Sequence, residues 1–99
     1  MTRGISRIKK RDGTVVDFVQ DKITTAVYKA MEANGIADRA AAKTVSDIAT
    51  FMLEDKFGGY TIPSVEQIQD IVELVLMKQS YHEVAKSYIL YRERHKEIR

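Results

Sequence analysis

The pattern of apolar positions changes once along the chain. Up to Phe18 apolar and polar residues alternate, and beyond it apolar residues recur at spacings of three and four. Alternation is typical of half-buried strands, whereas the second pattern is typical of amphipathic helices. The chain is therefore expected to begin with a β-hairpin cap, residues 1–19, and to continue as a helical bundle, residues 20–99.

The length of the loop decides the register of the hairpin. A three-residue loop at residues 11–13 pairs Ile8 with Val16 and puts Phe18 on the same apolar face. Gly13 then takes the left-handed conformation, which costs glycine little. A two-residue loop would leave no clean apolar face. The three-residue loop is the prediction.

In this register Lys10 shares the apolar face of the hairpin. An ammonium group aimed at a packed surface needs water, a carboxylate or a bound anion, because burying it unpaired is costly. The side chain could instead snorkel out to water at the end of the hairpin. Three consecutive cations at residues 9–11 favour an anionic ligand, although geometry alone leaves both interpretations open.

Four amphipathic segments follow the hairpin. They cover about residues 21–34, 38–56, 64–78 and 80 onward. Gly35 and the pair at residues 58–59 are expected to end the first two. Ser64 and Ser80, each with Gln or Glu three residues later, are expected to begin the last two as capping boxes.

The apolar stripes of these segments are expected to form the core. They comprise Ile23, Ala26, Val27, Ala30 and Met31; Ala42, Val45, Ile48, Ala49, Met52 and Leu53; Val65, Ile68, Ile71, Val72, Val75 and Leu76; and Val84, Ala85, Tyr88, Ile89 and Tyr91. The predicted fold is α+β, a four-helix bundle capped by a short N-terminal β-hairpin. Residues 60–61 are a weaker candidate for a third strand.

Composition limits the classes of function. The chain has 99 residues, 44% of them hydrophobic, which is expected to make one domain, residues 1–99. There is no cysteine, which excludes disulfides, thiolate metal sites and cysteine nucleophiles. His82 and His95 have no third ligand nearby, so no metal site is expected. No apolar run approaches the roughly twenty residues of a membrane span, and a cytoplasmic protein is expected.

Charge and motif spacing give no sign of catalysis. The net charge is only +2, which by itself does not call for nucleic acid. Glu66 and Asp70 have the i, i+4 spacing that is ordinary on an exposed helical face. Neither Lys10 nor Lys22 follows the glycine-rich loop of a phosphate-cleaving site. We therefore assign no catalytic residues.

Several separate motifs, in one order, resemble the ATP-cone domain. They are Lys10-Arg11-Asp12-Gly13; Val16, Phe18 and Lys22-Ile23; Glu66-Gln67-Ile68-Gln69-Asp70 with Val72-Glu73; and Ala85 with Tyr88-Ile89-Leu90-Tyr91-Arg92. The resemblance covers nearly the whole chain. ATP cones are regulatory domains, found mainly at the amino terminus of ribonucleotide reductases, that bind ATP or dATP and switch activity through quaternary structure.

The resemblance implies that a nucleotide lies between the hairpin and the ends of the helices. Lys10 and Arg11 would hold phosphates, and an arginine can grip two phosphate oxygens in one plane. Without a ligand, Lys22 would be unfavourable, because its positive charge lies in the first turn, at the positive end of the helix dipole. A phosphate placed there would satisfy both the lysine and the free backbone amides. Mg²⁺ is expected to accompany the nucleotide.

The remaining contacts are also implied by the resemblance. The matching pocket positions are Ile8, Val16, Phe18, Val19, Ile23, Ser64, Gln69, Ile89, Arg92 and Arg94. Val19 departs from the family, which commonly has an acidic or amide residue there. Ser64 could serve only as a helix cap, and the two arginines could belong to a solvated basic face.

The resemblance predicts an allosteric module that controls the activity or oligomeric state of a ribonucleotide reductase partner or linked catalytic domain. Reduction in that family depends on cysteine, so this chain is not expected to be a reductase alone. A nucleic-acid-binding module and a degenerate cone acting through protein contacts are the alternatives. A homo-oligomer is a further expected assembly. The charged last segment, without a Gly or Pro stop, favours a piece of a longer enzyme.

Overall fold

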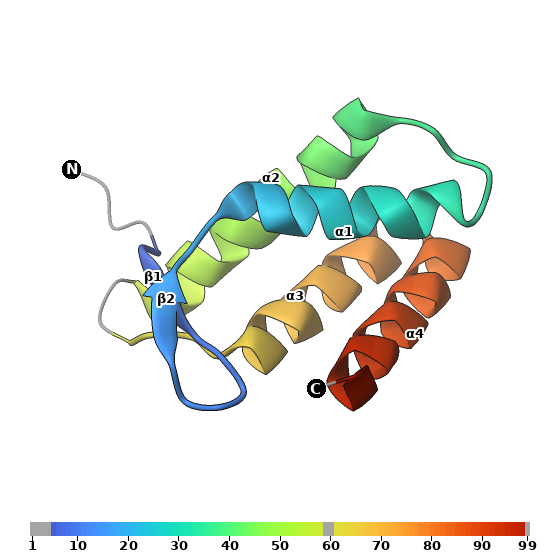
Figure 1. The fold of residues 1–99 in the computed structure, drawn as a ribbon. Helices are drawn as coiled ribbons and strands as arrows, with labels where there is room; N and C mark the ends of the chain where they lie inside the picture. The colour runs from blue at the N-terminus through green and yellow to red at the C-terminus, as the bar shows by residue number, and fades with distance from the viewer. Residues whose placement is uncertain (1–4, 59–60, 99) are drawn as a thin grey trace.

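The protein is described by a computed structural model covering residues 5–58 and 61–98. Its elements are β1 (Arg7–Lys9), β2 (Val15–Asp17), α1 (Gln20–Glu32), α2 (Arg39–Phe57), α3 (Val65–Lys78) and α4 (His82–Ile98). Figure 1 shows the hairpin at one end of a layer of helices, beside the end of α2 and the beginning of α3. The predicted α+β class, a helical bundle with an N-terminal hairpin, is confirmed. None of the described helices is long and apolar enough to cross a membrane.

The hairpin has the predicted register. β1 and β2 are antiparallel, and Ile8 lies opposite Val16. The amide of Lys10 donates to the carbonyl of Thr14 at 2.8 Å, which leaves three residues in the loop. Gly13 has φ 92°, the left-handed conformation that the loop requires. Lys10 therefore follows β1 on the side of the apolar residues.

The predicted third strand does not lie beside the hairpin in the described residues, where the sheet has two strands. Residue 60 falls outside the described residues, and Thr61 belongs to no strand. The neighbour of β1 is instead the segment just before α3. The amide of Lys9 donates to the carbonyl of Pro63 at 2.9 Å, and Lys9 forms a parallel bridge with Ser64. This backbone bond attaches the hairpin to the first turn of α3.

The core lies between the helices, and each helix packs against two others. α1 and α3 both contact α2 and α4. In α1, α2 and α3 the most completely buried apolar side chains are Val27, Met31, Ala42, Val45, Ala49, Leu53, Val72, Val75 and Leu76. All nine belong to the stripes read from the sequence. The helical period therefore identified the core-facing sides of α1, α2 and α3 correctly.

The stripe predicted for α4 was wrong at one residue. Val84, Ala85 and Tyr88 are buried, but Ile89 is 40% exposed. Successive helical residues are separated by about 100°, so a position next to Tyr88 turns away from the line that Val84 and Tyr88 share. α4 buries a narrower face than its apolar content suggested.

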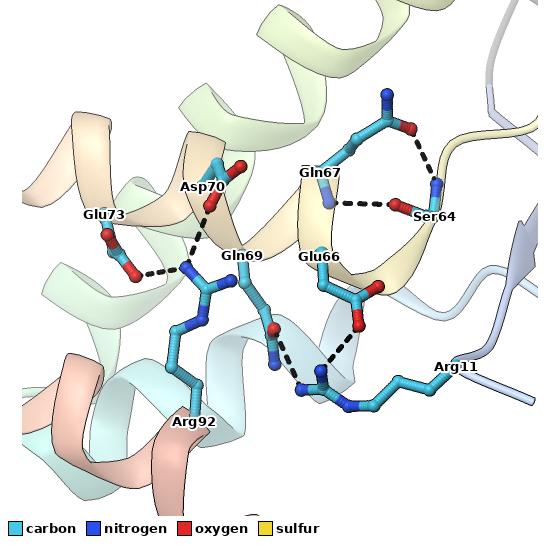
Figure 2. A network of polar contacts seen from close by, with 8 residues as sticks. All are labelled: Arg11, Ser64, Glu66, Gln67, Gln69, Asp70, Glu73 and Arg92. Atoms are coloured by element: carbon cyan, nitrogen blue, oxygen red, sulfur yellow. Dashed lines mark hydrogen bonds and ion pairs between the residues drawn. The ribbon is translucent and has the colours of Figure 1, made fainter. Parts of the chain in front are cut away.

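Ser64 begins α3 as predicted. Its Oγ accepts the amide of Gln67 at 3.1 Å, and the side-chain oxygen of Gln67 accepts the amide of Ser64 at 2.9 Å. This reciprocal capping box is drawn in Figure 2. Two of the free amides of the helix start are thereby satisfied. The cap fixes the end of α3 to which the hairpin is attached.

The second predicted capping box, at Ser80, is wrong. Ser80 has φ 68°, whereas a capping residue at a helix start needs an extended backbone. Its amide donates to Met77 at 3.0 Å, and the amide of Tyr81 donates to Leu76 at 2.8 Å. These two bonds form the Schellman motif that closes α3. Ser80 therefore ends one helix and does not begin the next.

The end of α1 shows the same motif with the residue that suits it. Gly35 has φ 77°, and its amide donates to Glu32 at 3.0 Å. The amide of Ile36 donates to Met31 at 2.9 Å. Ser80 and Gly35 thus adopt the same left-handed backbone conformation at a helix end. Ser80 has a Cβ atom, so this conformation carries a steric cost that it does not carry for Gly35.

Replacing Ser80 by glycine is expected to stabilise the protein. A left-handed non-glycine residue costs about 1 to 2 kcal/mol, part of which the extra freedom of glycine in the unfolded chain offsets. The free energy of unfolding of Ser80→Gly, measured by urea denaturation, should rise by about 1 kcal/mol. Ser80→Ala keeps the Cβ and should show no gain; an equal gain in both variants would contradict the explanation.

Leu76 tests the core. Its side chain is fully buried, so truncation removes apolar contacts and leaves a cavity. The free energy of unfolding of Leu76→Ala should fall by about 2 to 5 kcal/mol. Leu90 is 65% exposed, and the matched Leu90→Ala should stay within about 0.5 kcal/mol of the parent. Similar losses for both variants would contradict the packing described above.

Candidate functional site

A cavity of about 470 Å³ lies where the hairpin meets the helices. Residues of β1, β2, α1, α3 and α4, and of the segment joining β2 to α1, form its wall. Its volume falls in the range of about 300 to 1,000 Å³ that is usual for small-molecule sites. The hairpin closes one side of the cavity, so its position decides the shape of the site.

Two lysines bring positive charge to this wall. Lys10 comes from the end of the hairpin, and Lys22 comes from the first turn of α1. Asp17 and Gln69 also line the cavity. A helix start carries partial positive charge on its free amides, so Lys22 adds its charge where the field already favours an anion. The charged part of the wall is suited to a ligand with several negative oxygens.

The first turn of α1 is held against α2 by a small polar network. The side-chain amide of Gln20 donates to Ser46 Oγ at 3.0 Å. Thr24 Oγ1 and Ser46 Oγ lie 2.6 Å apart, and both residues are buried. Buried hydroxyls that satisfy each other fix the positions of the two helices. This network sets the part of α1 from which Lys22 projects.

The rest of the wall is apolar and aromatic. Phe18 faces the cavity from the end of the hairpin, and Tyr88 and Tyr91 face it from α4. The two tyrosine rings are stacked, with centroids 6.2 Å apart and planes inclined by 24°. Burial raises the pKa of Tyr88, while the positive charge of Arg92 acts in the opposite direction. Tyr88 therefore stays a neutral phenol at physiological pH.

Arg11 lies behind the wall of the cavity and does not line it. Its Nη1 is 2.5 Å from Glu66 Oε2, and its Nη2 donates to Gln69 Oε1 at 3.3 Å. Figure 2 shows the side chain reaching from the hairpin to the first turns of α3. Its side chain is 20% exposed. Gln69, which accepts one of these bonds, is itself part of the cavity wall, so the guanidinium is in contact with a residue of the wall.

Arg92 is engaged by α3 and also stays outside the cavity wall. Its Nη1 donates to Asp70 at 3.0 Å and forms a close ion pair with Glu73 (Figure 2). Burial alone would lower the pKa of Arg92, but the bonds to Glu73 and Asp70 outweigh it and raise that pKa. This arginine ties α4 to α3 as a permanent cation.

Eight of the residues expected at the site line the cavity. They are Ile8, Lys10, Val16, Phe18, Val19, Lys22, Ile23 and Gln69. Five others do not: Arg11, Ser64, Ile89, Arg92 and Arg94. Arg94 borders a different hollow, with Lys29 and Leu90, on the other side of Tyr91. The predicted residues that line the cavity thus come mostly from the hairpin and α1, and none of them comes from α4.

Six further residues line the cavity without having been expected there. They are Asp17, Ala26, Val65, Ile68, Tyr88 and Tyr91. Five of them were read from the sequence as core, because their helical stripes continue from the core into the cavity wall. Ala26 follows Lys22 by four residues, which places both on one face of α1. That spacing was the one signal that could have assigned it to the site.

Comparison with known proteins identifies the family to which the sequence is similar. The family model described as ATP cone domain matches residues 6–97. A vitamin B12-dependent ribonucleoside-diphosphate reductase of Thermoplasma acidophilum is 46% identical over 100 residues, which cover 96% of this chain and 12% of the relative. The ribonucleoside-diphosphate reductase subunit alpha of Chlamydia pneumoniae is 40% identical, covering 90% of this chain and 9% of the relative.

A third relative belongs to another class of reductase. The anaerobic ribonucleoside-triphosphate reductase of Salmonella typhimurium is 31% identical over 85 residues, which cover 86% of this chain and 11% of the relative. The chain thus spans about a tenth of the length of these curated relatives. The predicted resemblance is confirmed over nearly the whole sequence. On the strength of the family match and of these relatives, the chain belongs to the ATP-cone domain family.

Proposed function

We propose that this ATP cone binds ATP or dATP in the cavity under the hairpin and thereby regulates a ribonucleotide reductase. The proposal rests on the residues that line the cavity, because two lysines lie there beside a set of aromatic and apolar side chains. A nucleoside triphosphate has the same division into an anionic chain and a flat base. Residues 1–99 act in this proposal as one regulatory domain without catalytic residues.

The phosphates would lie between Lys10 and Lys22. Lys10 is exposed at the end of the hairpin, so its ammonium group can reach a phosphate that enters from solvent. Lys22 adds its ammonium group to the free amides at the start of α1. Charge-assisted hydrogen bonds are about twice as strong as neutral ones, so these two contacts would supply much of the affinity.

The base would lie against Phe18 and the tyrosines of α4. Stacking on aromatic rings is worth about 1 to 3 kcal/mol per base and favours no particular base. Val19 lines the cavity with a side chain that has no hydrogen-bonding group. Apart from the lysines and the tyrosine hydroxyls, Gln69 and Asp17 are the polar side chains on this wall that could distinguish adenine from other bases. Selectivity for adenine would rest on them.

Mg²⁺ would enter with the nucleotide. No group of three or more acidic or histidine side chains in the described part of the chain could hold a metal ion. Mg²⁺ usually keeps several of its waters and binds through the phosphate oxygens of its nucleotide, so no cluster of carboxylates is needed to bring it to the cavity. When bound, the ion would neutralise phosphate charge. The protein's own part would be to orient the phosphates through the two lysines.

Regulation follows from where the wall residues come from. A nucleotide that touches the hairpin and three helices bridges elements that are far apart in the sequence. It can shift an equilibrium only by binding one arrangement of these elements more tightly than another. The relatives are reductases, so the partner would be a reductase catalytic domain or subunit in the cytoplasm, acting singly or as a homo-oligomer.

Calorimetric titration with ATP, dATP and GTP in the presence of Mg²⁺ tests this function. Adenine nucleotides should bind saturably. Lys10→Ala and Lys22→Ala should each weaken ATP binding about tenfold or more, because each removes a charge-assisted bond to phosphate. Circular dichroism should show that both variants keep the helical fold.

The matched control is Lys86→Ala on α4. Lys86 is highly exposed and 3.5 Å from Glu83, outside the cavity wall. The affinity of Lys86→Ala for ATP should stay within about twofold of that of the parent. Equal affinity in all the lysine variants would refute the assignment. Binding of a short oligonucleotide but of no mononucleotide would favour a nucleic-acid interface instead.

A further inference from the structure

The first turn of α3 carries a carboxylate, Glu66, that already binds Arg11 of the hairpin loop. Glu66 Oε2 lies 2.5 Å from Arg11 Nη1, and Gln69 Oε1 accepts a longer bond from Arg11 Nη2. Gln69 belongs to the cavity wall, whereas Arg11 and Glu66 do not. The guanidinium is therefore one side chain away from the cavity that holds the phosphate-binding lysines.

We propose that Glu66 competes with the phosphates of the bound nucleotide for Arg11. The Arg11–Glu66 pair would act as a latch that holds the hairpin to α3, and a phosphate would open it by taking the guanidinium. The inference rests on the proposed function of the cavity. It adds to that function a residue that lowers affinity for the nucleotide and couples nucleotide binding to the position of the hairpin.

A carboxylate and a phosphate compete for the same donors. Both present pairs of oxygens that match the planar fork of a guanidinium. Both Nη atoms of Arg11 are already engaged, Nη1 by Glu66 and Nη2 by Gln69. A phosphate that takes both Nη atoms therefore has to displace Glu66, and breaking that ion pair subtracts from the affinity.

The latch is weak enough to be exchanged. The Glu66 side chain is 43% exposed, so water can solvate its carboxylate when Arg11 leaves. Glu66 also lies in the first turn of α3, where the helix dipole favours a negative charge without any partner. The Arg11 side chain is less exposed, at 20%, but its guanidinium is still accessible to water or to an anion when it leaves Glu66. When Arg11 leaves, the Glu66 carboxylate is therefore not left buried without a partner.

The second arginine attached to α3 shows the contrast. Arg92 is held by two carboxylates, Asp70 and Glu73, and its side chain is only 15% exposed. Glu73 is also less exposed than Glu66, at 25% against 43%. Releasing Arg92 would leave two acidic groups without their cation, one of them largely buried, which is costly. α3 thus holds one arginine permanently and another exchangeably.

Opening the latch would change how the hairpin is held. The tip is attached to α3 through Arg11, while β1 is attached through the backbone bond from Lys9 to Pro63. The backbone bond does not depend on Glu66 and stays as a pivot. When a phosphate takes Arg11, the tip becomes tied to the nucleotide in place of α3. The presence of phosphate would thereby be converted into a movement of the hairpin.

Glu66→Gln tests the competition. Glutamine keeps the size and hydrogen-bonding capacity of the side chain but removes the charge that holds Arg11. Calorimetric titration should show ATP binding about fivefold to tenfold tighter than in the parent. Glu83→Gln is the matched control, because Glu83 is also in the first turn of a helix and paired to a lysine, Lys86. Its affinity should change less than about twofold.

A second background separates competition from simple repulsion between Glu66 and the phosphates. In Arg11→Ala there is no guanidinium to compete for, so adding Glu66→Gln should bring no gain. An equal or larger gain in that background would overturn the proposal and leave only repulsion. A parent that binds ATP, with a Glu66→Gln variant that binds it no better, would also overturn it while the proposed function stands.

Hydrogen exchange tests the latch in protein without nucleotide. The amides of Lys10 and Gly13 donate to carbonyls within the hairpin end and report its opening. Their exchange should be several-fold faster in Glu66→Gln than in the parent or in Glu83→Gln. Unchanged exchange would overturn the latch. A parent that binds no nucleotide would overturn the proposed function and the competition with it, leaving any faster exchange as a structural effect alone.

Discussion

The attachment of the hairpin to the start of α3 is the constraint on which the site depends. One backbone bond, from Lys9 to Pro63, joins two segments that are more than fifty residues apart. The capping box of Ser64 fixes the end of α3 at this point. Because the register of the hairpin is also fixed, the bond determines where Lys10 and the apolar face of the hairpin lie relative to the helices. The backbone bond and the capping box therefore act at the same point, and together they hold the hairpin over the cavity.

α3 serves two purposes along one helix. Its apolar face supplies Val72, Val75 and Leu76 to the core. Its polar face carries carboxylates at helical spacing, which receive an arginine from the hairpin and another from α4 (Figure 2). One wall of the cavity therefore comes from a helix whose inner face packs in the core and whose outer face binds two arginines. Such a division suits the proposed release of Arg11, which would move the hairpin without unfolding the helices.

Much of the fold was accessible from the sequence because local rules determine it. Periodicity identified the buried faces of α1, α2 and α3, and turn chemistry identified the loop that ends in Gly13. Those rules failed at Ser80, where a serine takes a conformation that glycine prefers. They also failed at Ile89, where α4 buries less of its surface than its composition indicates. The failure at Ile89 concerns how α4 packs against its neighbours, and the failure at Ser80 concerns which residue closes α3; residue preference alone decides neither.

The sequence by itself determined the main elements and the register of the hairpin, because these follow from residue type and spacing along short stretches of chain. The family followed from motifs spread over nearly the whole chain, and through the family came the prediction that Lys10 and Lys22 bind phosphate. Only the tertiary structure decided which charges face the cavity. Arg11 and Lys10 are neighbours in the sequence, yet one is paired with Glu66 behind the wall and the other lines it. The physical reason is that Arg11 and Glu66 are fifty-five residues apart in the sequence, and their ion pair depends on how the hairpin and α3 are brought together. A pattern of neighbouring residues contains no information about that contact.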